Sequence, residues 1–300
     1  MMFLIDSSIY IFRAWQTLNT DTRNRFDEPD NAVQGFTETL CHILETHRPQ
    51  YFVCAFDECF RQGIRNKLYP EYKAGRPPAP ADLTPQFAKC KQVAQILGLP
   101  TIGSSKVEAD DIIGHFAGKA QAKKQRITIV SGDKDLAQFV SVDDLYWDLG
   151  RRPIAGYADL HKRFKVRPEQ IADWLALAGD KSDNIPGVPG VGPTTAARLL
   201  NKWENLDTLL ANLGEVAMMK FRGAPRVSRL LYENKTNIAL ARSLTGLIHD
   251  DGLPDDIDAC LRKTPSSGNV TEALIAMGFE EPLAQRVAKR TCVYDEQTYI

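Results

Sequence analysis

Nine carboxylates, grouped in five short stretches of the chain, are the residues best suited to chemistry. Several of them directly follow apolar runs typical of buried strands, so we expect them to gather at one end of a sheet. All are ionised in water at neutral pH, and such crowding would be strongly repulsive unless cations lay between the charges. The nine are Asp6, Asp57, Glu108, Asp110, Asp111, Asp133, Asp135, Asp180 and Asp183.

The donor atoms of this set indicate which cations it would take. Carboxylate oxygens without His or Cys favour magnesium or manganese over zinc or copper. Magnesium keeps several of its waters and meets only one or two carboxylates directly, so this many acids predict two ions. Such a pair suits in-line attack of water on a phosphodiester. A structural calcium site is the alternative, but the sequence lacks the EF-hand order of acids and glycine.

The elements that must position these acids alternate along the first half of the chain. Apolar strand-like runs and helix-like spacings predict a parallel sheet with crossover helices, and ligands of such sheets bind outside the carboxyl ends of the strands. We expect strands at 3–5, 51–56, 100–102 and 127–130, and helices at 32–47, 87–97 and 112–119. From about residue 165 the pattern becomes helical, at 168–177, 194–200, 206–213 and 227–244.

Two basic stretches could neutralise phosphates. Residues 61–91 hold seven Lys or Arg against two acids, and residues 220–242 hold six against one. In the first stretch Lys73 and Arg76 would share a face if the segment is helical, and they could draw a phosphate toward the metals. Tyr72 offers a stacking surface for an unpaired base. The alternative is a solvated, flexible loop.

A glycine-rich turn precedes a predicted helix in the second half. Gly187, Gly190 and Gly192 lead to a first helical turn that contains Pro193, Thr194 and Thr195. Proline suits that position, and the free N–H groups there can hold a phosphate without reading a base. A purely structural cap is the alternative.

Length and composition set the broader limits. Three hundred residues, 43% hydrophobic and 25% charged, predict an ordinary globular protein of two domains. The net charge of -1 averages over segments of opposite sign. The six cysteines have no zinc-like spacing, and no apolar run is long enough for a signal peptide or a membrane span. We therefore expect a reducing, cytoplasmic location.

Six motifs in this order resemble the 5′ nuclease (flap endonuclease) family, in particular the 5′-3′ exonuclease domain of bacterial DNA polymerase I. The resemblance extends from about residue 2 to 250. The motifs are residues 3–6, 52–57, 69–77, 107–111, 131–135 and 179–193.

The resemblance implies a fold and a division of the chain. It predicts a PIN-like parallel-sheet α/β catalytic domain at 1–165, with a helical arch at about 61–95. It further predicts a helix-three-turn-helix (H3TH) DNA-binding domain at 166–300. We expect a stand-alone nuclease, or one that works beside a separate DNA polymerase, and a monomer. Residues 250–300 carry no readable function.

The resemblance also implies roles for individual residues. Asp6, Asp57, Glu108 and Asp110 would hold the first Mg²⁺ or Mn²⁺. Asp133, Asp135 and Asp180 would hold the second, with Asp111 and Asp183 acting through water. Lys73 and Arg76 match the catalytic basic pair, and Arg222 lies where relatives contact a phosphate. A K⁺ ion would be bound by the backbone carbonyls of Leu177, Ala178, Pro186, Val188 and Val191.

These expectations define the competing functions. The first is a metal-dependent, structure-specific 5′-3′ exonuclease or flap endonuclease that acts on flapped, gapped or nicked DNA, and on RNA primers. The second is a non-catalytic homologue that binds DNA structures, and the third is a PIN-like ribonuclease. The complete set of nine acids favours the first, because a protein that only binds DNA gains nothing from charge that repels phosphate.

Overall fold

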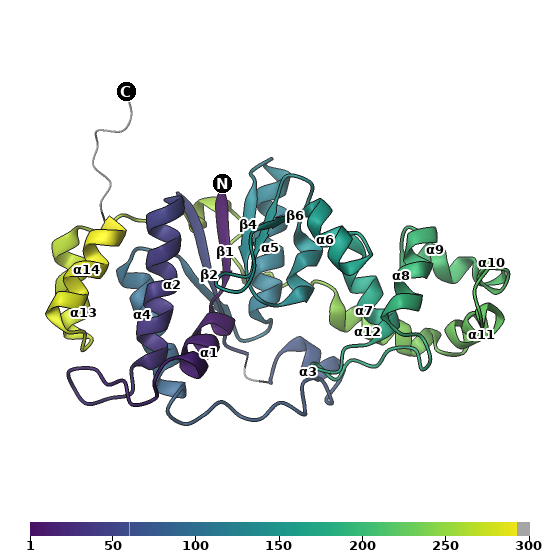
Figure 1. Cartoon of the computed structure of the whole chain (residues 1–300), viewed down its shortest axis with the longest axis horizontal. Helices are drawn as coiled ribbons and strands as arrows, with labels where there is room; N and C mark the ends of the chain where they lie inside the picture. Colours follow the sequence, from purple (N-terminus) through teal and green to yellow (C-terminus); the bar gives the residue numbers. More distant parts are fainter. Residues whose placement is uncertain (60, 293–300) are drawn as a thin grey trace.

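A six-stranded sheet forms the centre of the computed structural model, which describes residues 1–59 and 61–292 (Figure 1). The strand order is β3-β2-β1-β4-β5-β6, and only β6 is antiparallel to its neighbour. The expected α/β class with a mainly parallel sheet is thus confirmed, with two further short strands. The strands are β1 (Met2–Asp6), β2 (Tyr51–Asp57), β3 (Thr101–Ser104), β4 (Ile127–Val130), β5 (Leu145–Trp147) and β6 (Ala155–Gly156).

Helices cover both faces of the sheet, which is why β1, β2 and β4 read as continuous apolar runs. Alternate residues of β1 point to opposite faces. Phe3 and Ile5 belong to a core with α1 (Ser7–Thr17), α2 (Asn31–His47) and α4 (Thr84–Ile96). Met2 and Leu4 belong to a core with α5 (Ala109–Ala122). Since the carboxyl ends of these strands are in register, Asp6 lies opposite Ala55 near the end of β2.

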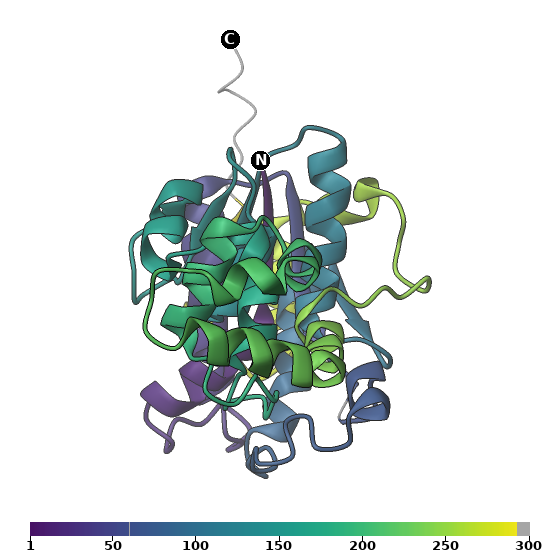
Figure 2. The same ribbon diagram turned by 90° about the vertical axis from the view of Figure 1, so that its right-hand side faces the viewer.

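The helical second half forms one end of the molecule (Figure 2). Its core is continuous with that of the α5 face of the sheet, so the two halves are not separated by a polar boundary. The expected helix at 227–244 is two helices, divided at Asn234. The elements are α6 (Tyr157–Phe164), α7 (Ile171–Ala178), α8 (Pro193–Lys202), α9 (Leu206–Ala211), α10 (Leu213–Ala217), α11 (Ala224–Glu233) and α12 (Lys235–Thr245).

The last helices correct the expected second domain at 166–300. α13 (Ser267–Ala276) and α14 (Glu281–Cys292) pack on α2 and α4 at the opposite end of the molecule (Figure 1). Their apolar residues Leu274 and Val287 join the same core as Phe3. The assignment of this segment to the helical DNA-binding domain is therefore wrong, because its apolar faces are buried against the sheet domain.

The segment expected as a helical arch at 61–95 is mostly not helical. α3 covers only Ile64–Leu68, a series of turns follows at 70–76, and α4 begins at Thr84. Pro70, Gly75 and the prolines from residue 77 onward interrupt helical hydrogen bonding. Lys73 even has a left-handed backbone, with φ of 54°. The condition for Lys73 and Arg76 to share a helical face is therefore not met, although both side chains reach the carboxylate of Asp183.

Among the helices in residues 1–59 and 61–292, none combines the length and apolarity needed to cross a membrane.

Candidate metal centre

Acids from four elements converge at the carboxyl end of the sheet. Asp6 ends β1, Asp57 ends β2, Asp133 follows β4, and Asp110 lies in the first turn of α5. Burial raises the pKa of Asp6 to about 7, and the charges of Asp57 and Asp133 contribute to this. Burial and the charges of Asp133 and Asp6 raise the pKa of Asp110 well above its ordinary value. The structure thus brings these acids close enough to oppose each other's ionisation.

Asp57 and Glu108 form the side of this cluster that faces α5. Asp57 Oδ1 accepts a hydrogen bond of 2.7 Å from the N–H of Ala109. Burial and then the charge of Glu108 raise the pKa of Asp57. Glu108 behaves in the opposite way: burial opposes its charge, but Lys73 and Arg65 hold its pKa below the usual value. Glu108 is thus ion-paired with Lys73, whereas Asp57 has no ion pair among the described residues.

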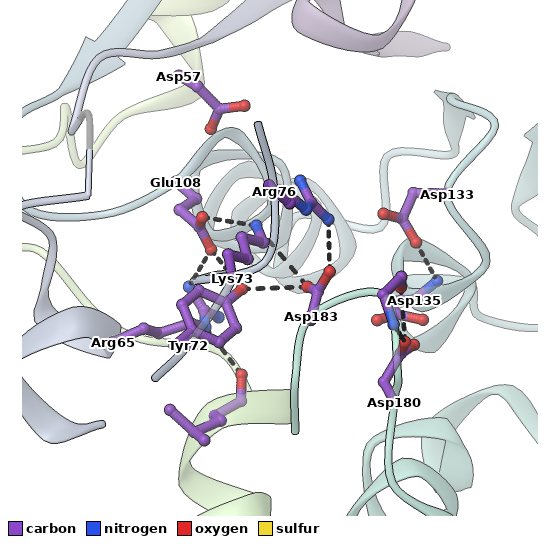
Figure 3. A network of polar contacts seen from close by, with 12 residues as sticks. Asp57, Arg65, Tyr72, Lys73, Arg76, Glu108, Asp133, Asp135, Asp180 and Asp183 are labelled. Carbon is purple, nitrogen blue, oxygen red and sulfur yellow. Dashed lines mark hydrogen bonds and ion pairs between the residues drawn. The ribbon is translucent and has the colours of Figure 1, made fainter. Parts of the chain in front are cut away.

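A second group contains Asp133, Asp135 and Asp180 (Figure 3). Lys134 Nζ lies 2.5 Å from Asp180 Oδ2 and 3.2 Å from Asp135 Oδ1. Burial followed by the charge of Asp133 raises the pKa of Asp135 to about 7. For Asp180, burial opposes the charge, but Lys134 and Ser182 lower the pKa. Asp135 Oδ1 is buried, and its contact with Lys134 is an ion pair without hydrogen-bond geometry.

Basic residues of the 61–83 segment lie against the acids (Figure 3). Lys73 Nζ donates to Glu108 Oε1 at 2.6 Å and lies 3.7 Å from Asp183 Oδ2. Arg76 Nη2 donates to Asp183 Oδ1. The backbone N–H of Lys73 donates to the carbonyl of Asp183 at 2.9 Å, which fixes this turn to the loop after α7. Burial would lower the pKa of the Lys73 ammonium, but Glu108 and Asp183 keep it well above its ordinary value.

Tyr72 does not present a stacking surface in this conformation. It is only 3% exposed and belongs to the core of the α5 face. Its hydroxyl donates to Glu108 Oε2 at 2.8 Å and lies 3.3 Å from Asp183 Oδ2. The expectation of an accessible ring for an unpaired base is therefore wrong here, because the ring is buried and the hydroxyl orients two carboxylates.

Asp111 is also placed differently from the expectation. It is 1% exposed, and Arg65 binds it with both Nη atoms. Its oxygens also accept from the N–H groups of Glu108 at 3.2 Å and Ile248 at 2.8 Å. A carboxylate with this many donors has no lone pair directed to the metal centre. In this conformation Asp111 binds Arg65 and the N–H of Ile248, and its contact with a metal through water stays a prediction.

Two cations that the sequence analysis did not single out shape the site. Arg65 also donates to the carbonyls of Leu244 at 2.8 Å and Gly246 at 2.9 Å, which links α3 to the end of α12. Lys134 stands between two acids in the stretch 133–135. That position was a usable signal for Lys134, whereas the partners of Arg65 are distant in sequence and visible only in the fold.

The donor chemistry fits hard divalent ions. Asp6, Asp57, Asp110, Asp133 and Asp135 supply only oxygens, which suit such ions. Burial, followed by repulsion from neighbouring acids, raises the pKa of Asp6, Asp57, Asp110 and Asp135, and a bound cation would relieve both effects. In the described residues, however, no three His, Cys, Asp or Glu side chains are arranged to hold an ion as they stand. Lys73, Arg76 and Lys134 occupy oxygens of Glu108, Asp183 and Asp180. Metal binding therefore requires these side chains to turn.

The glycine-rich turn packs closely on the end of α7. Asp180 and Ile185 exchange backbone hydrogen bonds of 3.0 and 2.8 Å, and the N–H of Val188 donates to the carbonyl of Leu177 at 2.8 Å. A Cβ on Gly187 would meet the nitrogen of Gly179 at 2.4 Å, so this position requires glycine. Gly190 has φ of 88°. The backbone of 177–180 and that of 185–191 thus lie side by side.

The predicted DNA contacts of this half are at the surface. Gly190, Gly192, Thr194 and Arg222 are exposed, the first three at the turn and the start of α8. Arg222 stands before α11.

Comparison with known proteins identifies the family and the fold to which this architecture corresponds. The family model described as 5′-3′ exonuclease, N-terminal resolvase-like domain, matches residues 1–165. The model described as 5′-3′ exonuclease, C-terminal SAM fold, matches residues 166–267. The fold is also that of the T5 5′-exonuclease bound to divalent metal ions, with 15% identity, a TM-score of 0.66 and 97% of both chains covered. Flap endonuclease-1 from Methanococcus jannaschii gives 14% identity and a TM-score of 0.58, with 97% of this chain and 91% of the other covered. These solved structures support the expected PIN-like sheet domain followed by a helical domain.

Sequence relatives are closer than these structures. The 5′-3′ exonuclease of Aquifex aeolicus is 36% identical over 70% of this chain and 72% of its own length. DNA polymerase I of Rhizobium leguminosarum is 36% identical over 96% of this chain, which spans only 28% of that polymerase. Because two family models match consecutive parts of the sequence on the fold expected for them, the chain belongs to the 5′-3′ exonuclease family.

Proposed function

We propose that this chain is a metal-dependent, structure-specific 5′-3′ exonuclease and flap endonuclease. It hydrolyses phosphodiester bonds near the 5′ ends of flapped, gapped or nicked DNA during replication and repair. The observation that carries the proposal is the mutual crowding of Asp6, Asp57, Asp110 and Asp133 at the carboxyl end of the sheet. A protein that only bound DNA would not need uncompensated negative charge where a phosphate must approach.

The proposed cofactors are two Mg²⁺ or Mn²⁺ ions. Asp6, Asp57, Glu108 and Asp110 would hold one, and Asp133, Asp135 and Asp180 the other. When bound, such ions activate the attacking water and stabilise the charge on the leaving oxygen. In this conformation the Asp183 carboxylate is ion-paired with Lys73 and Arg76. Asp183 could contact the second ion through water only after these two side chains move away. The T5 5′-exonuclease, a protein of the same fold, is solved with divalent metal ions, zinc in that structure, which supports dependence on a divalent metal.

Lys73 and Arg76 act on the substrate in this proposal. Both are positively charged and lie beside the acids, where an entering phosphate would otherwise be repelled. When they turn from Glu108 and Asp183 toward the phosphate, they hold it and balance the charge that develops on its oxygens. Their release also frees the two carboxylates, so substrate binding and metal binding favour the same conformation.

The turn at 187–192 and the start of α8 hold the duplex next to the cut strand. Exposed N–H groups at Gly190, Gly192 and Thr194 suit a phosphate. The carbonyls of Leu177, Ala178, Pro186, Val188 and Val191 lie on the two adjacent backbone runs, which supports a K⁺ site there. The complex of the Rad2 catalytic core, which has the same fold, with a DNA substrate agrees with a DNA-binding role.

The decisive experiment is cleavage of a 5′-flap duplex with Mg²⁺ and with Mn²⁺. The wild type should cut near the junction, and Asp135→Asn should bind the flap but cut at least about 100-fold more slowly. Asp251→Asn, an exposed acid outside the cluster, is the matched control. A wild type that binds the flap and cuts it with neither ion would leave the non-catalytic DNA-binding function as the correct one.

A further inference from the structure

An open groove of about 530 Å³ lies between the end of α6 and the helices α7 and α8, outside the metal centre. We call it the α6–α8 groove. Its boundary includes Arg163, Phe164 and Lys165 at the end of α6, Trp174 on α7, and Thr194 and Arg198 on α8.

Contacts between the three helices fix the shape of the α6–α8 groove. The rings of Phe164 and Trp174 are 6.3 Å apart, and Trp174 Nε1 donates to the carbonyl of Pro193 at 2.9 Å. Asn201 Nδ2 donates to the carbonyl of Lys165 at 2.8 Å. The groove therefore has a fixed aromatic side and does not depend on a loose loop.

The charge of the groove has one sign. Arg163, Lys165 and Arg198 are exposed, no lining residue is acidic, and the described chain offers none of the three an ion-pair partner. Stacking holds two of them in place, since Arg163 lies 4.9 Å from the Phe164 ring centre and Arg198 lies 5.2 Å from that of Phe221. Three cations around one hollow attract a polyanion and raise its local concentration.

Two further cations near this surface are paired. Arg167 Nε lies 2.8 Å from Glu169, and Lys202 Nζ lies 2.9 Å from Glu215. Exposed cations without an ion pair in the described residues also occur at Lys162, Lys220, Arg222 and Arg226, but those of the groove surround one hollow.

We propose that the α6–α8 groove holds the sugar-phosphate backbone of the duplex beyond the glycine-rich turn. Pro193 and Thr194 line it and directly follow Gly192, so a strand held at the turn continues into the groove. Arg163, Lys165 and Arg198 bind its phosphates, and Phe164 and Trp174 pack on its sugars. The inference rests on the proposed function for the presence of DNA, and it assigns a contact beyond the catalytic centre.

The test measures DNA binding separately from cleavage. Fluorescence anisotropy of a labelled 5′-flap duplex in chelator gives Kd over a range of salt for the full chain. The groove variant is Arg163→Gln/Lys165→Gln/Arg198→Gln. The charge-matched control is Lys124→Gln/Arg286→Gln/Lys289→Gln, three exposed cations outside the groove.

Each lost phosphate contact lowers the slope of log K against log salt by about 0.9. The groove variant should lower it by about 2 to 3 and weaken Kd at least about tenfold, irrespective of sequence. The control should match the wild type. Stepwise shortening of the duplex arm should remove the difference between groove variant and wild type before it removes binding.

Lys165→Gln serves if the triple variant does not fold, because the Lys165 side chain makes no hydrogen bond or ion pair within residues 1–59 and 61–292. It should lower the slope by about 0.9. A groove variant whose Kd and slope equal those of the control would overturn the inference, even if the wild type cuts flaps. A wild type that binds but does not cut would instead overturn the proposed nuclease function. The groove contact would then still be decided by the change in the slope of log K against log salt.

Discussion

At the scale of single residues, the metal centre consists of crowded carboxylates, and Lys73, Arg76 and Lys134 occupy some of their oxygens. The positions of Asp6, Asp57 and Asp133 at strand ends could be predicted from apolar runs alone. Tyr72 and Asp111 could not be placed, because whether a Tyr ring or an Asp carboxylate is buried depends on partners such as Arg65, 46 residues away from Asp111. The metal-ligand roles themselves stay predictions.

Lys73 offers the most direct test at this scale. Lys73→Ala should lower the single-turnover cleavage rate of a 5′-flap about 100-fold or more, because the charge on the phosphate oxygens loses a preorganised cation. Lys124→Ala, an exposed lysine remote from the site, is the control. Rapid-quench measurement at saturating protein separates this effect from binding. An unchanged rate would remove Lys73 from the catalytic group.

Asp135 should make the metal-free protein less stable as pH rises. Its pKa is raised to about 7 when folded, so the folded state binds the proton more tightly than the unfolded state. The free energy of unfolding therefore falls between about pH 4 and pH 7 and is lowest above that range. In chelator, Asp135→Asn should be more stable than the wild type at pH 8 by on the order of 1 kcal/mol or more, with a smaller difference at pH 5.

Urea unfolding at the two pH values measures this prediction. Asp251→Asn is the control, because it removes one exposed acid. An Asp135→Asn variant that is less stable than the wild type at pH 8 would mean that Lys134 compensates the charge of Asp135 fully.

At the scale of elements, the ion pair of Arg65 and Asp111 joins three segments. Arg65 on α3 binds Asp111 in the first turn of α5 and two carbonyls at the end of α12. α3 begins the segment with Lys73, and α5 begins with Glu108 and Asp110. The pair therefore positions the basic segment relative to the acids and connects both to the helical half.

Loss of Arg65 should be strongly destabilising. Arg65→Leu leaves the buried Asp111 charge uncompensated and should lower the free energy of unfolding by about 3–5 kcal/mol. Arg65→Leu/Asp111→Leu should recover part of this loss, although the N–H groups of Glu108 and Ile248 stay unpaired. Equilibrium urea unfolding of wild type, both single variants and the double variant gives the coupling. Additive effects would show that the two residues do not act as a pair.

At the scale of the whole molecule, the last described helices pack against helices from the first third of the chain. α13 and α14 pack on α2 and α4 after the helical half is complete, so the sheet domain is built from both ends of the described sequence. The metal centre lies at the carboxyl end of the sheet, and the α6–α8 groove lies outside it, between α6, α7 and α8. The C-terminal helices thus complete the core between the sheet and the helices α2 and α4.

Leu274 tests this arrangement. It is fully buried on α13 in the core shared with Phe3, so Leu274→Ala should cost about 2–5 kcal/mol in unfolding free energy. Leu261→Ala, at a leucine that is 51% exposed, should cost much less. Both are measured by urea unfolding followed by far-UV circular dichroism. A loss for Leu274→Ala no larger than for Leu261→Ala would show that α13 is not part of the core.

The sequence was enough to predict the alternation of strands and helices, the end of the sheet at which acids gather, and the family. These follow from local patterns: apolar runs, the residue after each strand, and ordered motifs. The fold had to be known to see that 69–83 is an irregular segment, that Tyr72 and Asp111 are buried, and that α13 and α14 join the first core. Each of these depends on contacts between residues far apart in sequence, whose free energies outweigh local preference.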